Sequence, residues 1–251
     1  MTTKYNEGVF SNDLHINADD VCIKGQLTLK RLLLMFQKVA LEHYTTKAQS
    51  WDEVVKSGRS WVLTKMEIHI TRLPKLSEQI QVATWSKGTQ GIKGHREYEI
   101  SCQGEILVKA QSEWIYLNFI EKKPEEFPSE MFPNFIQVHR TNFKSDISNW
   151  RLKKVGLQSE PITYALRYTD FDINQHLNNT CYFELLEDAL CSRGLKAKTL
   201  YATFKREIPF GTKKIDLFIE QNAQTDDGAS QTFSLEFRNE QTSSFLAKIR
   251  T

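Results

Sequence analysis

The sequence predicts an α+β fold in which long helices pack against antiparallel sheets. Two observations predict it. A helical apolar stretch followed by four strand-like stretches occurs once in the first half of the chain and again, in the same order, in the second half. A proline also has the same place in both copies, because Pro74 precedes Ile80 by six residues and Pro209 precedes Ile215 by six. We therefore expect a duplicated unit, with one helix and one sheet in each copy.

The first helix is expected from about Thr28 to Tyr44, over the sequence TLKRLLLMFQKVALEHY. Its apolar residues at helical spacing are Leu29, Leu32, Leu33, Phe36, Val39 and Ala40. Leu34 and Met35 lie off this stripe, so apolar surface covers most of the helix. A helix of that kind is buried in a protein core, and a curved sheet around it would bury it.

The second helix is expected to begin after Asn178 or Asn179, either of which suits an N-cap, and to end near Gly194. Its apolar residues at helical spacing are Tyr182, Leu185, Leu186, Ala189 and Leu190. Acidic residues occupy the opposite side of this helix. We expect the apolar side to pack in a core.

Strand-like alternation fills the sequence after each helix. It covers residues 60–86 and 94–118 in the first copy, and 200–221 and 232–251 in the second. Between the copies, EKKPEEFPSEMFPNF carries three of the six prolines, and a polar stretch then continues to about Glu160. We therefore expect a first half at 1–135, a linker at 136–160 and a second half at 161–251.

Composition narrows the classes of function. A formal charge of +2 on 251 residues gives no support for nucleic-acid or membrane-surface binding. The first twenty residues lack the features of a signal or transit peptide, and the longest apolar run, LLLMF, is too short to cross a bilayer. The four cysteines form no C-x-x-C pair, and we expect reduced, half-buried thiols. We expect a soluble cytoplasmic protein.

The chemistry is expected just ahead of the second helix, at Asp172, Asn174 and His176. In extended backbone these alternate positions point to one side, and a helix N-terminus follows them that could stabilise an oxyanion. A calcium loop of the EF-hand type is excluded, because its sixth position would be Gln175 rather than glycine. The segment has no second histidine to complete a transition-metal site. A purely structural use in turns and caps remains open.

Several segments resemble the acyl-acyl carrier protein thioesterases of plant plastids and bacteria. DFDINQHLNN, which includes Asp172, Asn174 and His176, is similar to the D-x-N-Q-H-x-N-N segment of that family. FKREI, at 204–208, is similar to its Y-R-R-E-C segment, and AQSEWIYLN followed by KPEE to its strand and following stretch. GQLTLKRLLLMFQKVALEH lies where its first long helix does. The resemblance covers nearly the whole chain and implies a double (tandem) hot-dog fold, in which each half is a helix wrapped by a curved sheet.

The resemblance also implies a function, which is hydrolysis of fatty acyl-acyl carrier protein in fatty acid biosynthesis. It implies a site of Asp172, Asn174 and His176 with Glu207, which we expect on a strand from Tyr201 to Ile208. Glu207 and His176 would activate water, Asp172 would orient His176, and Asn174 would hold the water or the carbonyl. Direct attack by Asp172 is the competing mechanism. No cofactor or metal is expected.

One departure from the family bears on the nucleophile. Many plant members have cysteine after the glutamate, whereas this chain has Ile208. A cysteine nucleophile is therefore excluded at that position. Cys181 and Cys191 are expected to pack within the second helix.

The implied acyl-chain pocket lies in the first half, at Leu33, Leu34, Phe36 and Met66. The implied partner is acyl carrier protein, an acidic protein, and the basic residues expected to bind it are Arg193, Lys196, Lys198, Lys205 and Arg206. Neither nucleic acid nor a membrane is expected as a partner, and homodimer formation is left open. The competing functions are a non-catalytic acyl-binding module, a hot-dog dehydratase and an acyl-CoA thioesterase.

Overall fold

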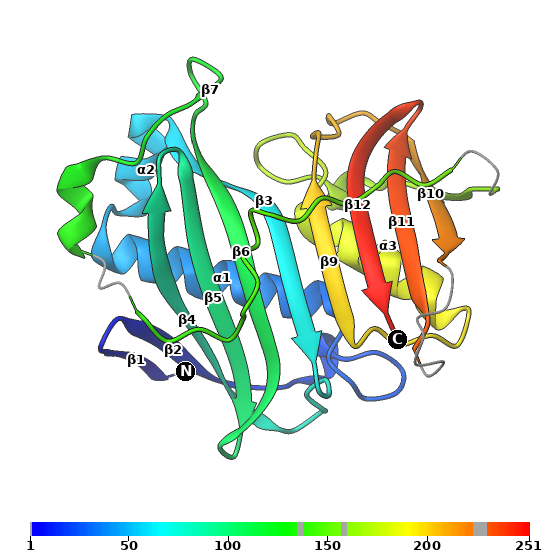
Figure 1. The fold of residues 1–251 in the computed structure, drawn as a ribbon, viewed down its shortest axis with the longest axis horizontal. Coiled ribbons are helices and arrows are strands. Elements are labelled where there is room, and N and C mark those ends of the chain that lie inside the picture. The colour runs from blue at the N-terminus through cyan, green and yellow to red at the C-terminus, as the bar shows by residue number, and fades with distance from the viewer. Residues whose placement is uncertain (1, 135–137, 157–159, 223–229) are drawn as a thin grey trace. The chain divides into compact units, whose positions relative to one another are not determined.

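The computed structural model describes residues 2–134, 138–156, 160–222 and 230–251. The chain divides into two compact units. Unit 1 comprises residues 1–27 and 31–149, and unit 2 comprises residues 28–30 and 150–251. Each unit contains a long helix and an antiparallel sheet (Figure 1), so the α+β class predicted from the sequence is confirmed.

Unit 1 is built on six main strands and helix α1 (Leu29–Lys47). The strands are β1 (Thr2–Asn6), β2 (Val9–His15), β3 (Arg59–Ile70), β4 (Gln79–Gln90), β5 (Lys93–Cys102) and β6 (Glu105–Asn118). They pair antiparallel in the order β1-β2-β4-β5-β6-β3. A short strand β7 (Lys123–Pro124) pairs with β6, and the minor helices are η1 (Ala18–Asp20), α2 (Trp51–Ser57) and η2 (Ser129–Asn134).

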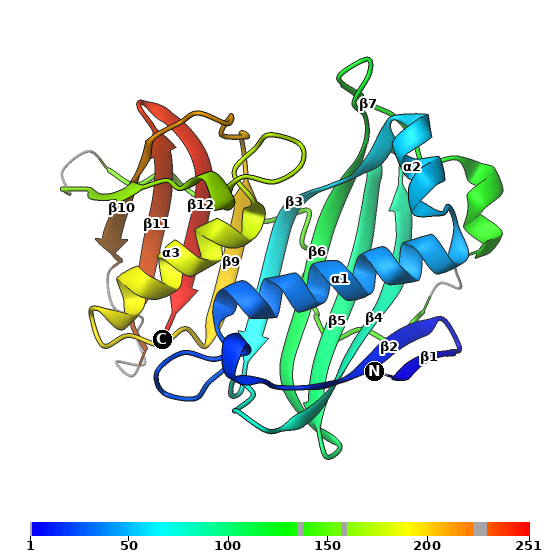
Figure 2. The same ribbon diagram turned by 180° about the vertical axis from the view of Figure 1, so that it is seen from behind.

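Helix α1 crosses one face of this sheet (Figure 2). The predicted apolar stripe forms the contact, because Leu32, Leu33 and Phe36 are fully buried. The Phe36 ring lies 4.8 Å from that of Tyr98 on β5. The helix continues to Lys47, three residues beyond the predicted end. The β1–β2 hairpin and α2 were not predicted from the sequence.

Unit 2 repeats the plan on a smaller scale, with helix α3 (Asn179–Cys191). Its strands are β8 (Ile162–Ala165), β9 (Thr199–Phe204), β10 (Lys214–Gln221), β11 (Thr232–Asn239) and β12 (Thr242–Arg250), and η3 (Tyr168–Asp170) precedes α3. The antiparallel order is β9-β12-β11-β10-β8. Tyr182 of α3 stacks on Phe245 of β12 at 4.7 Å, which fixes the helix against the sheet.

The two units share one detail, a loop in front of each long helix. These loops, 17–27 and 167–177, have the same succession of 3-10 turn, bridge and bend. The left-handed position is Gly25 (φ 67°) in the first loop and Gln175 (φ 62°) in the second. In each loop a backbone bond holds the following segment, from Leu27 N–H to Pro74 O and from Leu177 N–H to Ile208 O, both 2.8 Å.

This pairing corrects the predicted equivalence of the two prolines. Pro74 has the place of Ile208, and Lys75 has the place of Pro209. The strands beyond still match as predicted, because Ile80 and Ile215 pair with equivalent residues of β2 and β8. One extra residue in unit 2, between Phe210 and Ile215, accounts for the difference.

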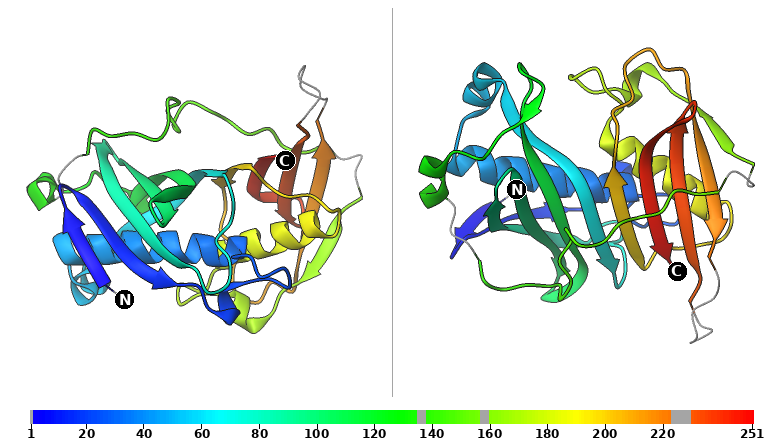
Figure 3. Two further views of the ribbon diagram at one scale, coloured as in Figure 1. Left: turned by 90° about the horizontal axis from the view of Figure 1, so that it is seen from below. Right: turned by 45° about the horizontal axis from the view of Figure 1, so that its top comes forward.

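The polar stretch between the two halves is fastened to both sheets where it is described. Residues 138–149 lie on the face of the unit 1 sheet opposite α1 (Figure 3). We call this segment the connector. Glu97 of β5 accepts hydrogen bonds from Thr141 Oγ1 (2.6 Å) and from Asn142 N–H (2.7 Å). In unit 2 the buried Glu236 accepts one from Val155 N–H (2.8 Å).

Candidate active site

The loop 171–177 is a closed turn. Asp172 N–H donates to His176 O (2.9 Å) and Gln175 N–H donates to Asp172 O (2.9 Å). Phe171 and Leu177 bridge the two sides of the turn. The predicted extended backbone, with Asp172, Asn174 and His176 on one side, is therefore wrong, because these local backbone bonds close the segment on itself.

Asp172 shapes this turn. Its Oδ1 accepts the backbone N–H of Asn174 at 2.9 Å and that of His176 at 3.4 Å. This is the turn-forming use of aspartate that the sequence left open. Among the described residues, these backbone groups are the hydrogen-bond donors that reach the Asp172 carboxylate. Asp172 thus positions His176 through its main chain rather than through its imidazole.

His176 and Glu207 are brought together from separate segments. His176 Nε2 lies 3.3 Å from Glu207 Oε2. Strand β9 ends at Phe204, so Glu207 is not on a strand as predicted. The segment beyond β9 is held beside the loop by Leu177 N–H to Ile208 O and by Phe210 N–H to Gln175 O (2.7 Å). Both side chains reach solvent, with 34% of His176 and 53% of Glu207 exposed.

Asn174 and the start of α3 complete the surroundings of this pair. Asn174 is exposed on the turn, one residue before the left-handed Gln175. Asn178 is the N-cap of α3, and its Oδ1 accepts the N–H of Thr180 at 2.9 Å. Helix α3 begins three residues beyond His176, so the positive end of its dipole lies close along the chain to the imidazole.

The cysteines differ in their surroundings. Cys181 is buried in α3, where its Sγ donates to Asp170 O at 3.3 Å. Burial, and then the charge of Asp170, raise the pKa of Cys181 to about 11, so its thiol is protonated at neutral pH. Cys191 is exposed at the end of α3, and the prediction that it packs within the helix is wrong. Ile208, which follows Glu207, is fully buried.

One group of potential metal ligands lies near the loop, although the sequence did not predict it. Atoms of Asp170, Cys181 and Glu184 lie within 4.8 Å of one another. The Asp170 carboxylate is bound by Arg167, with Nη2 to Oδ1 at 2.8 Å. The Glu184 carboxylate pairs with Lys30, with Nζ to Oε2 at 2.6 Å. Both carboxylates of this group are therefore already paired with cations.

The predicted acyl-pocket residues lie inside unit 1. Leu33 and Phe36 are fully buried, Met66 is 1% exposed, and Leu34 is partly exposed. The same interior contains a polar group that the sequence did not indicate. Arg96 Nη1 on β5 donates to His43 Nδ1 of α1 at 2.9 Å and to Thr84 Oγ1 at 3.2 Å.

The imidazole of His43 is an acceptor in this contact. Burial, and then the charge of Arg96, lower its pKa to about 3, so it is neutral at physiological pH. A cation pointing into the interior could not be inferred from Arg96 in the sequence, since arginine is ordinarily a surface residue.

The five predicted carrier-binding residues fall into two separate sets. Arg193 lies just beyond the end of α3 and donates to Ala189 O (2.9 Å), while Lys196 and Lys198 precede β9. Lys205 and Arg206 follow β9, directly before Glu207. The six residues of β9 separate the sets by roughly 20 Å. Only the second set adjoins the His176–Glu207 pair.

None of the described helices is long and apolar enough to span a membrane.

The chain matches known proteins along most of its length. Residues 7–135 match the model of the acyl-ACP thioesterase N-terminal domain, and residues 154–250 that of the acyl-ACP thioesterase C-terminal domain. A chloroplastic acyl-[acyl-carrier-protein] hydrolase of Cuphea viscosissima is 30% identical over 70% of this chain and 46% of its own length. A chloroplastic palmitoyl-acyl carrier protein thioesterase of Gossypium hirsutum is 28% identical over 79% of this chain and 52% of its own length. The chain spans about half the length of the curated relatives it matches.

Solved structures share its fold. An acyl-ACP thioesterase from Bacteroides thetaiotaomicron superposes with a TM-score of 0.83 at 18% identity, covering 98% of this chain and all of that one. The 12:0-ACP thioesterase from Umbellularia californica superposes with a TM-score of 0.78 at 18% identity, covering 96% of this chain and 93% of that one.

Proposed function

The chain belongs to the acyl-ACP thioesterase family, and from this premise we propose that it hydrolyses the thioester of fatty acyl-acyl carrier protein. The products are a free fatty acid and the carrier protein, and the place of the reaction is fatty acid biosynthesis. The observation that supports this most directly is the 3.3 Å contact between His176 Nε2 and Glu207 Oε2 beside the start of α3. A base next to an imidazole is what hydrolysis by water requires.

We further propose that units 1 and 2 are the two halves of a double hot-dog fold, with the acyl chain held in the first and the chemistry in the second. The equivalent loops support this duplication. They also support a single active site. The positions of His176 and Glu207 correspond to Gln26 and Leu73 in unit 1, where neither side chain can act as a base. Unit 1 therefore keeps the loop without the catalytic groups.

In the proposed reaction, Glu207 accepts a proton from a water molecule that His176 helps to hold. The water oxygen attacks the thioester carbonyl carbon, and the positive end of the α3 dipole stabilises the resulting oxyanion. The tetrahedral intermediate then collapses, the carbon–sulfur bond breaks, and the leaving thiolate takes the proton from Glu207. Positioned acid–base groups of this kind contribute about 10²–10⁴-fold.

Asp172 and Asn174 have supporting roles in this proposal. Asp172 binds the N–H groups of Asn174 and His176, which fixes the point from which the imidazole projects. Asn174 is placed to hold the water or the carbonyl oxygen. An aspartate that already accepts two hydrogen bonds is a weakened nucleophile, which favours this role over direct attack by Asp172. An acyl-enzyme trapped on the wild type and absent from Asp172→Asn would reverse that choice.

We also propose a cytoplasmic location. None of the four cysteines, all of which lie in the described parts of the chain, forms a disulfide, which fits a reducing compartment. The plant relatives named above are chloroplastic.

Release of free thiol from acyl carrier proteins of several chain lengths tests the function. We expect turnover with a preferred chain length, and a lower kcat/KM on the matching acyl-CoA, which shares the thioester but lacks the protein. Absence of thiol release from both substrates would contradict the proposal. Equal kcat/KM on both would make the carrier protein irrelevant to recognition.

A further inference from the structure

An apolar cluster is exposed beside the loop that carries His176. Tyr168 is 81% exposed, Ile173 87% and Phe210 51%. The Phe210 ring meets that of Tyr168 edge-on at 5.8 Å and that of Phe171 at 5.4 Å. Phe210 is tied to the loop by its N–H bond to Gln175 O. Large apolar side chains that gather on an exposed surface, with polar residues around them, are typical of an interaction site.

Cations surround this cluster. The segment 205–214, which joins β9 to β10, contains Lys205, Arg206, Lys213 and Lys214, all of them exposed, and one carboxylate, Glu207. None of these four cations forms an ion pair with any residue in the described parts of the chain. A group of uncompensated positive charges is therefore adjacent to both the apolar cluster and the His176–Glu207 pair.

Unit 1 shows the same loop with its arginine paired to a carboxylate. Arg72 has the place of Arg206, since each donates its N–H to the neighbouring strand, to Leu107 O at 3.4 Å and to Ser244 O at 3.3 Å. The Arg72 guanidinium is bound by Glu78, with Nη1 to Oε2 at 2.9 Å.

In unit 2 the place of Glu78 is taken by Thr212 and Lys213. Thr212 matches the N–H of Glu78, because the Glu78 N–H donates to Lys75 O and the Thr212 N–H donates to Pro209 O. Lys213 matches the carbonyl of Glu78, because Glu78 O accepts from Ile16 N–H and Lys213 O accepts from Leu166 N–H. The carboxylate is replaced by a hydroxyl and an additional cation. Among the described residues, the unit 1 loop keeps one exposed cation without an ion pair, Lys75, whereas the loop beside the candidate active site keeps four.

We propose that the segment 205–214 and Tyr168, with the turn residue Ile173, form the surface on which the acidic acyl carrier protein docks. The inference rests on the proposed function. An apolar centre with a charged rim is the usual composition of a protein interface, and an acidic partner complements this rim. Because the pantetheine arm is long, the carrier body rests beside the His176–Glu207 pair while the thioester reaches it. The surface excludes Arg193, Lys196 and Lys198, which lie beyond the opposite end of β9.

Thr212→Glu tests the proposal by restoring in unit 2 the acid that unit 1 has. The dissociation constant for holo-acyl carrier protein should rise about three- to fivefold, the effect of a surface ion pair. It should rise about tenfold in Phe210→Ala, the usual loss for an aromatic anchor. KM for acyl carrier protein should rise by similar factors in both variants. The effect of Thr212→Glu on the dissociation constant should become smaller as the salt concentration is raised, because salt screens surface charges.

Two controls isolate docking from other effects. Gln231→Glu makes a matched change from a neutral residue to an acid at an exposed position near the other end of β12, and it should leave the dissociation constant unchanged. An acyl thioester of N-acetylcysteamine, which carries neither protein nor phosphate, should be hydrolysed at wild-type kcat/KM by Thr212→Glu.

Other results would overturn the proposal. Unchanged carrier affinity in both Thr212→Glu and Phe210→Ala would do so, as would an equal loss on the N-acetylcysteamine thioester. Loss of binding to anionic phosphatidylserine vesicles in these variants, with carrier affinity intact, would assign the surface to a membrane instead. A wild type that binds the carrier but hydrolyses neither thioester would contradict the proposed function and leave the docking surface standing.

Discussion

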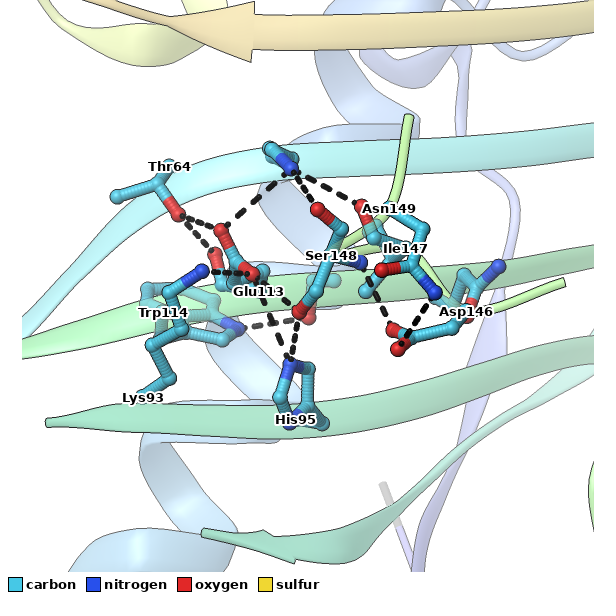
Figure 4. Close-up of polar contacts among 12 residues, drawn as sticks. Thr64, Lys93, His95, Glu113, Trp114, Asp146, Ile147, Ser148 and Asn149 are labelled. Atoms are coloured by element: carbon cyan, nitrogen blue, oxygen red, sulfur yellow. Dashed lines mark hydrogen bonds and ion pairs between the residues drawn. The ribbon is translucent and has the colours of Figure 1, made fainter. Parts of the chain in front are cut away.

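Glu113→Gln should loosen the connector from unit 1 and lower the free energy of unfolding of that unit. Glu113 is a β6 residue with a side chain only 3% exposed. Its Oε2 accepts from Ser148 Oγ at 2.6 Å and pairs with Lys93 Nζ at 2.9 Å (Figure 4). Lys65 Nζ, also buried, lies 3.9 Å from Oε1 and donates to Ile147 O at 3.1 Å.

The expected loss follows from these contacts. Glutamine keeps the shape but removes the charge. Two hydrogen bonds to a charged acceptor contribute about 1.5–3 kcal/mol each, and the substitution also removes the carboxylate that lies 3.9 Å from the buried Lys65 Nζ. We expect a loss of about 3–5 kcal/mol, a large part of the roughly 5–15 kcal/mol that stabilises a domain.

Urea unfolding followed by tryptophan fluorescence measures this loss. Four of the five tryptophans belong to unit 1: Trp51, Trp61, Trp85 and Trp114. Asp13→Asn is the control, because its partner Lys4 and Asp13 itself are 56% and 40% exposed and should contribute at most about 1 kcal/mol. A loss no larger in Glu113→Gln than in this control would refute the reasoning.

The stability difference between wild type and Glu113→Gln should depend on pH. Burial by itself would raise the pKa of Glu113, but hydrogen bonds with His95, Ser148 and Lys93 outweigh it and hold the pKa below its usual value. A carboxylate with a lowered pKa stabilises the fold above its unfolded pKa, about 4.3, and loses that contribution as pH falls toward the folded value. The difference between wild type and Glu113→Gln should be complete at pH 7 and shrink below about pH 4. A difference that stays constant to pH 3 would contradict the assigned charge.

Three further predictions concern the cysteines, the acyl pocket and the two loops. Iodoacetamide at pH 7.5 should label Cys191 well before Cys181, because the Cys181 thiol is buried and protonated. For the same reason Cys181→Ala should keep kcat within about threefold of wild type. Peptide mapping that finds Cys181 labelled first would contradict this. Met66→Ala should shift the chain-length profile toward longer acyl groups while kcat on the best substrate stays within about tenfold, because one methylene in an apolar pocket is worth about 1–3 kcal/mol; an unchanged profile would misplace the pocket. Gly25→Ala should lower the free energy of unfolding in urea by about 1 kcal/mol, because a Cβ there meets no atom within 4 Å and the left-handed backbone is the whole cost. Gln175→Gly should be neutral or slightly stabilising. An equal loss in both variants would show that the loops are not strained alike.

The helices and most strands could be predicted because their patterns are local. The stripe from Leu29 to Ala40 is a sufficient signal for a buried helix, and α1 begins within one residue of the prediction. The turn at Asp172 could not be recognised by alternation, because an aspartate that bonds main-chain N–H groups closes the backbone and overrides the period-two pattern.

The buried charged residues could not be predicted from the sequence. Glu97, Glu113 and Glu236 are buried because each binds a segment far away along the chain. In the sequence they look like solvent-facing residues of alternating strands. Arg96 is similar, since its partner His43 comes from α1. Glu207 could be named only from the family resemblance, because a half-exposed glutamate after a strand carries no local signal.

The central claim is that His176 and Glu207, in unit 2 alone, hydrolyse the thioester. The most direct test is to measure kcat for thiol release from acyl carrier protein in His176→Ala, in Glu207→Gln and in the double variant. Gln26→Ala, at the position in unit 1 equivalent to His176, is the control. Circular dichroism checks the fold of each variant. We predict a fall of about 10²–10⁴-fold in each catalytic variant, a double variant little worse than the worse single one, and wild-type activity in Gln26→Ala. Folded Glu207→Gln with kcat within about tenfold of wild type would contradict the claim.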